Sequence, residues 1–194
     1  MKNKKEIIDF FNKNAHNWDL KEKPQTHQKI KKILSNIKLK NYENVCDVGC
    51  GTGILYPYLS KLFKNYTGID FAYEMIKIAK EKFPQAKFIT GDFDNHRFKK
   101  NFFDLVIIFN AFPHFENRIT TILKANKILK KQGKIIIAHS FKLNKINKIH
   151  KETENKIIKK HIITEKELKE LFKKSNFKKI KIIHNDYFYI EGTK

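Results

Sequence analysis

The stretch "VCDVGCGTG", residues 45–53, places three glycines in alternation directly after a short apolar run. Gly49, Gly51 and Gly53 follow Asp47 at every second position. Because glycine has no Cβ, it admits a positive φ and the close approach of another group. A glycine-rich loop between a strand and a helix is a common ligand site. The stretch is therefore a candidate loop for a dinucleotide, a phosphate or a sulfonium cofactor.

Two common glycine-rich loops do not match these residues. A phosphate-binding Walker loop ends in Gly-Lys-Ser/Thr, whereas Ile54 and Leu55 follow Gly53 here. The dinucleotide fingerprint G-x-G-x-x-G fits Gly49 and Gly51 but requires a third glycine where Ile54 stands. A nicotinamide or flavin nucleotide is therefore a less favoured ligand.

A carboxylate stands at the end of the next apolar run. Asp70 closes "YTGID", residues 66–70, and lies 17 positions after Gly53. At the end of a strand beside the loop, its oxygens can accept hydrogen bonds from the hydroxyls of a ribose. The loop also opens a helix, whose N-terminus favours a carboxylate. A ligand with an amino acid end, a ribose and an adenine fits these features.

Apolar runs alternate with amphipathic stretches along the chain, which predicts an α/β fold. Strands are expected at 43–49, 66–70, 86–92, 102–110 and 133–140, with two more in 178–192 around Asn185 and Asp186. Helices are expected at 5–15, 26–37, 53–63, 73–83, 116–130, 142–161 and 164–177, with Thr26 and Thr164 as N-caps. We expect a doubly wound, mostly parallel seven-stranded sheet with a C-terminal antiparallel hairpin. Ligands of such sheets bind beyond the carboxyl ends of the strands.

Four motifs, in order, resemble those of the class I S-adenosylmethionine-dependent methyltransferases, over about residues 41–139. They are "VCDVGCGTG" (45–53), "GIDFAYEMIKIAK" (68–80), "ITGDF" (89–93) and "FDLVIIFNAF" (103–112). The resemblance implies a Rossmann-like methyltransferase fold and S-adenosylmethionine as the cofactor. It implies cofactor contacts from Asp47, Gly49, Gly51, Gly53, Asp70, Phe71, Met75, Asp92, Phe93 and Asn110.

The resemblance also implies a role for individual residues of the second and third motifs. Asp70 matches the acid that binds the ribose. Phe71 and Met75 are similar to residues that flank the adenine. Asp92 would meet the adenine amine, and Phe93 would meet the ring with its backbone and its aromatic face.

The acceptor end of the site is expected at the ends of the fourth and fifth strands. The resemblance puts Asn110 near the methionine portion of the cofactor, and it makes "FFNKNAHNWD", residues 10–19, similar to a helix that closes over the cofactor. His114 lies just beyond the fourth strand, His139 ends the fifth, and His150 lies in the next helix. Because these two strands should be neighbours, we expect His114 and His139 to face the same crevice. Neutral imidazole can take a proton near pH 7, so these three are candidate catalytic residues. They could instead hold a metal ion, or serve only in turns and caps.

We predict methyl transfer to a small-molecule acceptor. The (D/N)PP(Y/F) tetrapeptide of adenine and glutamine N-methyltransferases is replaced by "NAFP", residues 110–113, and we expect no separate RNA-binding domain. The alternative is an RNA or protein methyltransferase that docks through its lysines, and a binding protein with a vestigial pocket is a third class.

The net charge of +21 suggests a nucleic-acid partner at first sight. Of the 41 basic residues, only Arg97 and Arg118 are arginines, the preferred residue for bidentate phosphate contacts. The lysines are spread along the whole chain. The charge therefore indicates a solvated lysine surface, and nucleic acid is not the predicted partner.

We expect a single domain over residues 1–194. It comprises an N-terminal helical cap (1–40), a cofactor-binding core (41–140), and a substrate-side helix with the C-terminal hairpin (141–194). Cys46 and Cys50 are expected to be reduced thiols. No apolar run approaches the roughly 20 residues of a membrane span, and the N-terminal segment lacks the apolar region of a signal peptide. We therefore predict a cytoplasmic protein with no membrane partner.

Overall fold

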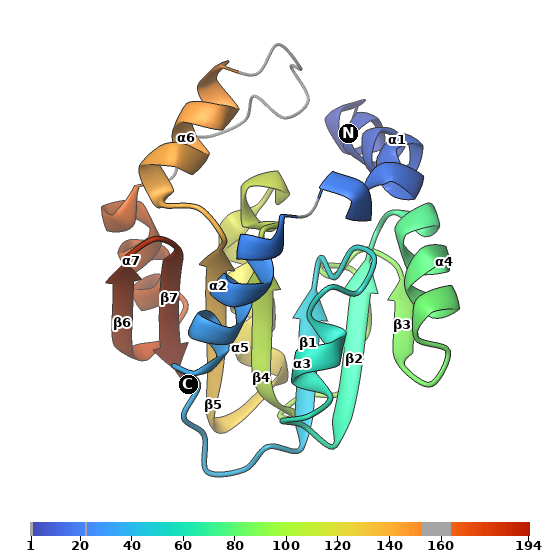
Figure 1. Cartoon of the computed structure of the whole chain (residues 1–194). Helices are drawn as coiled ribbons and strands as arrows, with labels where there is room; N and C mark the ends of the chain where they lie inside the picture. Colours follow the sequence, from blue (N-terminus) through green and yellow to red (C-terminus); the bar gives the residue numbers. More distant parts are fainter. Residues whose placement is uncertain (1, 22, 153–163) are drawn as a thin grey trace.

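The structure is a seven-stranded sheet with the strand order β3-β2-β1-β4-β5-β7-β6 (Figure 1). This computed structural model describes residues 2–21, 23–152 and 164–194. Strands β1 to β5 pair in parallel, whereas β7 is antiparallel to both β5 and β6. The expected doubly wound sheet with a C-terminal antiparallel hairpin is confirmed. The strands are β1 (Asn44–Val48), β2 (Asn65–Asp70), β3 (Lys87–Thr90), β4 (Phe103–Phe109), β5 (Leu129–His139), β6 (Lys178–His184) and β7 (Phe188–Thr193).

The strand order reverses between β1 and β4. From β1 the chain moves outward through β2 to β3, and then returns to place β4 on the other side of β1. In the register, Asp47 of β1 lies between Gly68 of β2 and Ile107 of β4. A reversal of this kind leaves a crevice beyond the carboxyl ends of the strands, because the loops on its two sides diverge. The glycine loop follows β1 at this crevice.

Helices cover both faces of the sheet, and α2 and α3 lie in front of it in Figure 1. Strands β1 and β4 are buried along their whole length, as expected for continuous apolar runs that are covered on both sides. One face carries α2 (Pro24–Leu34), α3 (Tyr56–Leu59) and α4 (Tyr73–Lys82), and the other carries α5 (Arg118–Ile128) and α7 (Glu165–Lys174).

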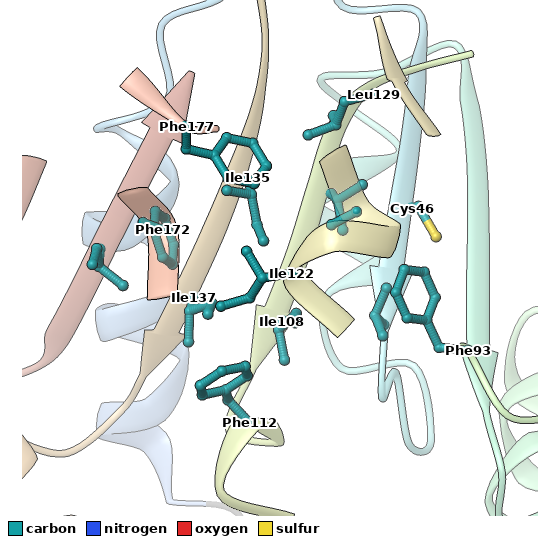
Figure 2. Close-up of a cluster of buried hydrophobic side chains, with 14 of the residues drawn as sticks. Cys46, Phe93, Ile108, Phe112, Ile122, Leu129, Ile135, Ile137, Phe172 and Phe177 are labelled. Atoms are coloured by element: carbon teal, nitrogen blue, oxygen red, sulfur yellow. The ribbon is translucent and has the colours of Figure 1, made fainter. Parts of the chain in front are cut away.

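Figure 2 shows the hydrophobic layer between the sheet and the helices α5 and α7. Ile122 of α5 and Phe172 of α7 are fully buried in one cluster with Ile108 of β4 and Ile137 of β5. Burial of a side chain of this size contributes about 1.5–3 kcal/mol. Because this layer fixes α5, it also holds the loop at residues 110–117 at the carboxyl edge of the sheet.

Residues 2–21 comprise helix α1 (Lys2–Asn14) and two short 3-10 turns, Ala15–Asn17 and Asp19–Lys21, and are called the roof. The roof lies beside the carboxyl edge of the sheet rather than on one of its faces (Figure 1). Helix α1 and the turn Ala15–Asn17 pack against α4. Asn12 of α1 accepts a hydrogen bond from the backbone N–H of Glu74, at 3.1 Å. This contact caps α4, whose own N-cap residue makes no side-chain hydrogen bond.

The two predicted N-caps have different outcomes. Thr164 caps α7, since its hydroxyl accepts a hydrogen bond from the N–H of Glu167 at 3.1 Å. Thr26 is not an N-cap, because α2 already begins at Pro24 and has Lys23 at the N-cap. Proline is favoured at this first position, since the N–H that it lacks would have no helical partner there.

Other expected boundaries shift by several residues. The helix predicted over 53–63 is reduced to the single turn of α3, because turns of the glycine loop occupy its first residues. Strand β5 begins at Leu129, within the helix predicted over 116–130. The helix predicted over 142–161 is present as α6 (Leu143–Glu152), and its remainder lies outside the described residues.

In the part of the chain that the structure describes, no helix has the length and apolar character needed to cross a membrane. The division into a cap, a core and a substrate-side segment stays a prediction.

Candidate functional site

A cavity of about 350 Å³ opens beyond the carboxyl ends of β1, β2 and β4. This volume lies in the range of about 300–1,000 Å³ that is typical of small-molecule sites. The structure brings the glycine loop and the loops after β2, β3 and β4 together in its wall. The wall includes nine of the residues predicted for the site: Gly49, Gly51, Asp70, Phe71, Met75, Asp92, Phe93, Asn110 and His114.

The three glycines of the loop have positive φ but different neighbours: φ is +71° at Gly49, +53° at Gly51 and +84° at Gly53. A Cβ at Gly49 would lie 2.6 Å from the Cβ of Ala111, and a Cβ at Gly53 would lie 3.1 Å from the ring of Phe88. A Cβ at Gly51 would meet no described atom within 4 Å. Packing therefore explains the first and third glycines, whereas Gly51 borders open space in the cavity wall.

Asp47 and Gly53 do not line the cavity. Asp47 is 1% exposed, and its Oδ2 accepts a hydrogen bond from the hydroxyl of Tyr66 at 2.8 Å. Burial raises the pKa of Asp47 to about 7, although the hydrogen bond from Tyr66 lowers it. Asp47 therefore lies beneath the glycine loop and outside the cavity wall. The cofactor contact that the family resemblance implies for Asp47 stays a prediction.

Asp70 lies at the end of β2 and faces the glycine loop. Its Oδ2 accepts a hydrogen bond from the N–H of Gly51 at 3.0 Å, and its Oδ1 accepts one from the N–H of Ala72 at 2.8 Å. Burial raises the pKa of Asp70, and these backbone hydrogen bonds oppose the rise. A carboxylate has about four lone-pair sites, so each oxygen keeps one for a donor in the cavity.

The loop after β3 carries two aspartates with different partners. Asp92 forms an ion pair with Lys4 of α1 and accepts hydrogen bonds from the side chain of Asn95 and the N–H of Asp94. Asp94 accepts a hydrogen bond from the hydroxyl of Thr121 at 3.1 Å, and burial raises its pKa. The carboxylate of Asp92 is thus already engaged by the roof, a contact that the sequence did not predict.

Phe11 of α1 is the centre of an aromatic cluster in the cavity wall. Its ring centroid lies 5.3 Å from that of Trp18, 6.0 Å from that of Phe71 and 5.2 Å from that of His114, all in edge-on arrangements. Edge-to-face pairs contribute about 0.5–1.5 kcal/mol beyond the area that they bury. The cluster therefore holds α1 against the loops after β2 and β4.

A polar contact ties the roof to the glycine loop as well. The hydroxyl of Thr52 donates to Oδ1 of Asp19 at 2.6 Å, and the ammonium of Lys82 binds Oδ2 of Asp19 at 2.8 Å. Lys82 also donates to the backbone oxygen of Thr52 at 3.1 Å. The roof is therefore attached both to the glycine loop and to α4.

Asn110 directly follows β4 and adopts the left-handed conformation, with φ of +54°, which asparagine tolerates better than most residues. Its side-chain oxygen accepts a hydrogen bond from the N–H of Ser140 at 2.8 Å. Its own N–H donates to the backbone oxygen of Ala138 at 3.0 Å. These bonds to the end of β5 fix Asn110 in the cavity wall.

The expectation that His114 and His139 face one crevice is not met. His114 lines the cavity, whereas His139 lines a small apolar pocket on the side of α6 and α7. Alternate residues of a strand share a face, and His139 shares its face with Ile137, which packs under α5. The Nδ1 atom of His139 accepts a hydrogen bond from the N–H of Phe141 at 3.2 Å. The side chain of His150 lies outside the described residues.

Within residues 2–21, 23–152 and 164–194, no group of three or more histidine, cysteine, aspartate or glutamate side chains could hold a metal ion. His114 and His139 line different pockets, and the side chain of His150, the third histidine of the metal alternative, lies outside the described part of the chain. Cys46 and Cys50 are buried free thiols, and burial raises the pKa of each.

The structure adds wall residues that sequence reasoning missed. Lys4 lines the cavity from the roof, and Phe115, Glu116 and Asn117 line it from the loop after β4. Glu116 was expected in a helix, but α5 begins one residue after Asn117, which caps it. The signal for these loop residues was their place directly after the fourth strand, where ligands of such sheets bind.

The chain is similar to known proteins. A family model described as "Methyltransferase domain" matches residues 46–137. The chain is 27% identical over 142 residues to the demethylmenaquinone methyltransferase of Thermotoga maritima. This alignment covers 70% of this chain and 62% of that protein. It is 30% identical over 145 residues to the malonyl-[acyl-carrier protein] O-methyltransferase of Priestia megaterium. This second alignment covers 71% of this chain and 52% of that protein. The chain spans about half the length of the curated relatives that it matches.

A solved structure extends the likeness over nearly the whole chain. An S-adenosylmethionine-dependent methyltransferase from Thermotoga maritima matches 97% of this chain and 98% of its own, with a TM-score of 0.79 at 19% identity. The strand order, the glycine loop at the switch point and the family match together define a Rossmann-like methyltransferase domain. The chain belongs to the class I S-adenosylmethionine-dependent methyltransferases. S-adenosylmethionine is the methyl donor of this family.

Proposed function

We propose that this protein transfers a methyl group from S-adenosylmethionine to a small-molecule acceptor bound in the cavity. The observation that carries the proposal is the open space at Gly51. There the backbone is bare toward the cavity, and its N–H is held by Asp70. No described side chain fills the space beside the backbone of Gly51. Such a space suits a ligand that lies against the backbone.

The residues of the wall fit the parts of S-adenosylmethionine in order. Asp70 would receive the ribose hydroxyls on the lone pairs that the backbone leaves over. Phe71 and Met75 would flank the adenine, and Asp92 with Phe93 would meet its edge. The methionine end would lie along Gly49, Gly51 and Asn110, where the loop after β1 faces the loop after β4.

When bound, S-adenosylmethionine supplies a methyl group on a positively charged sulfur, so the leaving group is already activated. The chain's own residues then have to orient the acceptor and exclude water. Phe11 and Trp18 of the roof cover the cavity for this purpose. His114 would take a proton from an acceptor that has to lose one.

Titration calorimetry with S-adenosylmethionine and its demethylated product tests the proposal. We expect micromolar affinity, and Asp70→Ala should weaken it by about 1.5–3 kcal/mol, or about 10- to 150-fold. The control is Asp186→Ala, because Asp186 lies on the exposed hairpin and pairs with Lys32. If the unmutated protein binds neither compound, the proposed function is wrong. Unchanged affinity in Asp70→Ala would overturn only the role of Asp70.

A second candidate is an RNA methyltransferase, and one cluster near the end of β5 favours it. The ammonium groups of Lys29 and Lys145 lie 5.5 Å and 4.4 Å from the ring centroid of Phe141. Lysines around an aromatic ring suit a nucleic-acid strand. Tight RNA binding at physiological salt would support this candidate, whereas weak binding that moderate salt abolishes would favour the small-molecule acceptor. A cytoplasmic location stays part of the proposal.

A further inference from the structure

The charge of the cavity wall is opposite in sign to that of the chain. The chain has 41 lysines and arginines and only 20 aspartates and glutamates. The charged residues of the wall are one lysine, Lys4, and four acids, Asp70, Asp92, Asp94 and Glu116. A wall with an excess of carboxylates favours a cation, and the lysine-rich exterior does not explain it.

Three of the four carboxylates are engaged by the protein itself. Asp70 accepts hydrogen bonds from two backbone N–H groups, and Asp92 forms an ion pair with the ammonium of Lys4. Asp94 accepts a hydrogen bond from the hydroxyl of Thr121. Among the residues that the structure describes, none gives Glu116 a hydrogen bond or an ion pair. Its side chain is exposed at the mouth of the cavity. Glu116 is therefore the carboxylate of the wall that no described residue binds, whereas Asp70 and Asp94 keep only the lone pairs that their protein partners leave over.

Glu116 also lies beside the aromatic part of the wall. His114 and Phe115 precede it in the loop after β4, and all three line the cavity. A Cβ at Gly49 would lie 3.9 Å from the ring of Phe115, so this loop closes directly on the glycine loop. Phe11 covers His114 edge-on from the roof. Aromatic rings beside a carboxylate make a site that suits an ammonium group.

We propose that the acceptor is a small amine whose ammonium group binds Glu116, so that the reaction is N-methylation; this rests on the methyl transfer proposed above. His114 takes one proton from the ammonium and passes it to solvent. The nitrogen lone pair then bonds to the methyl carbon, while the carbon–sulfur bond breaks and leaves its electron pair on sulfur as a neutral thioether. The nitrogen of the product carries the positive charge, which Glu116 neutralises.

Calorimetry in the presence of S-adenosylhomocysteine measures acceptor binding apart from turnover. The probes are amines with butyl, phenylethyl and indolylethyl skeletons, each compared with the alcohol and the carboxylate of the same skeleton. We expect at least one amine to bind tenfold more tightly than both of its partners. Glu116→Gln should weaken that amine about fivefold, the upper range for an exposed charge pair, and leave the alcohol unchanged. The control is Glu81→Gln on the exposed face of α4.

Mass spectrometry of the product should then show one added methyl group on the preferred amine. The inference is overturned if no amine of the set binds better than its alcohol and carboxylate, or if Glu116→Gln leaves the preference for the amine intact. It is also overturned if the alcohol of a skeleton is methylated faster than its amine. If the unmutated protein does not bind S-adenosylhomocysteine, the result is a different one, because it overturns the proposed function itself.

Discussion

Lys4 and Asp92, 88 residues apart in the sequence, form an ion pair across the cavity wall. Oδ2 of Asp92 accepts from both Lys4 and Asn95, and Oδ1 accepts from the N–H of Asp94. Asp92 is also the residue proposed to meet the adenine amine. Because an oxygen with two donors has no lone pair left, the amine has to use Oδ1 or displace a donor. If the adenine amine binds Oδ2, the roof and the cofactor compete for that oxygen.

Lys4→Met removes the competitor, so we expect it to raise the affinity for S-adenosylhomocysteine. The two side chains are 35% and 22% exposed, which limits the pair to about 1 kcal/mol and the gain to about fivefold. The unfolding free energy should change by less than about 1 kcal/mol for the same reason. Calorimetry and urea unfolding measure the two effects, and Lys5→Met, at an exposed position of α1, is the control. A lower affinity in Lys4→Met would mean instead that Lys4 holds the roof closed over the ligand.

The two histidines near the ends of β4 and β5 should respond differently to substitution. His114 lines the cavity, so His114→Asn should reduce methyl transfer by about 10²- to 10⁴-fold while the affinity for S-adenosylmethionine stays within about threefold. His139 lines a separate apolar pocket, so His139→Asn should keep near-normal turnover. Initial rates with the preferred acceptor, together with calorimetry, distinguish the two variants. A large loss of turnover in His139→Asn with normal rates in His114→Asn would reverse this assignment.

The sheet, and the cavity-wall residues at the carboxyl ends of its strands, could be predicted because both depend on short-range sequence patterns. A continuous apolar run predicts a strand buried on both faces, as in β4, and residues directly after such runs meet at one edge of the sheet. The order of the motifs was enough to bring Gly51, Asp70 and Asn110 into one cavity wall. No contact between distant helices was needed for this prediction.

The orientation of His139 could not be predicted, because β5 is apolar on both faces. Ile135 and Ile137 pack into the layer under α5, while Ile136 and Ala138 pack into the opposite layer. An alternating pattern assigns faces only where one face is polar, and this run has no polar face before its end.

The contacts of the roof with the cavity wall could not be predicted for a different reason. Its contacts, Lys4 with Asp92 and Phe11 with His114, join segments that are about a hundred residues apart. Periodicity predicts that α1 is amphipathic, but it does not identify the partner of either face.

Asp47 should make the stability of the protein fall as the pH rises. Burial raises its pKa from 3.8 to about 7, so between these values the folded protein binds more protons than the unfolded chain. Stability is then lost toward higher pH, with a slope of up to about 1.4 kcal/mol per pH unit. Asp47→Asn cannot ionise, and its amide oxygen can still accept the hydrogen bond from Tyr66. We expect urea unfolding of this variant to lack that slope.

Two further variants separate this effect from the rest of the protein's titration. Tyr66→Phe removes a hydrogen bond that lowers the pKa of Asp47, so the loss of stability should extend to higher pH. Asp186→Asn is the control, because the pKa of this exposed carboxyl is lowered by Lys32 and it titrates below the same window. Parallel pH profiles for Asp47→Asn and the unmutated protein would show that Asp47 is not the source of the slope.

Gly51 and Gly53 should separate ligand binding from folding, although both have positive φ. Substitution by alanine adds strain of about 1–2 kcal/mol at each position. At Gly53 the new Cβ also meets the rings of Phe88 and Phe83 at 3.1–3.3 Å, so Gly53→Ala should lower stability further. At Gly51 the Cβ enters open space in the cavity wall, so Gly51→Ala should be the milder change for stability.

For S-adenosylhomocysteine binding the order should be reversed. The methyl group at position 51 occupies the space proposed for the cofactor backbone contact, so Gly51→Ala should lose at least tenfold in affinity. Gly53 does not line the cavity, so Gly53→Ala that remains folded should stay within about threefold of the unmutated protein. Urea unfolding and calorimetry at a temperature where both variants are folded give the two rankings. If the same variant is worse in both measurements, the space at Gly51 does not receive the cofactor, and its glycine serves backbone conformation alone.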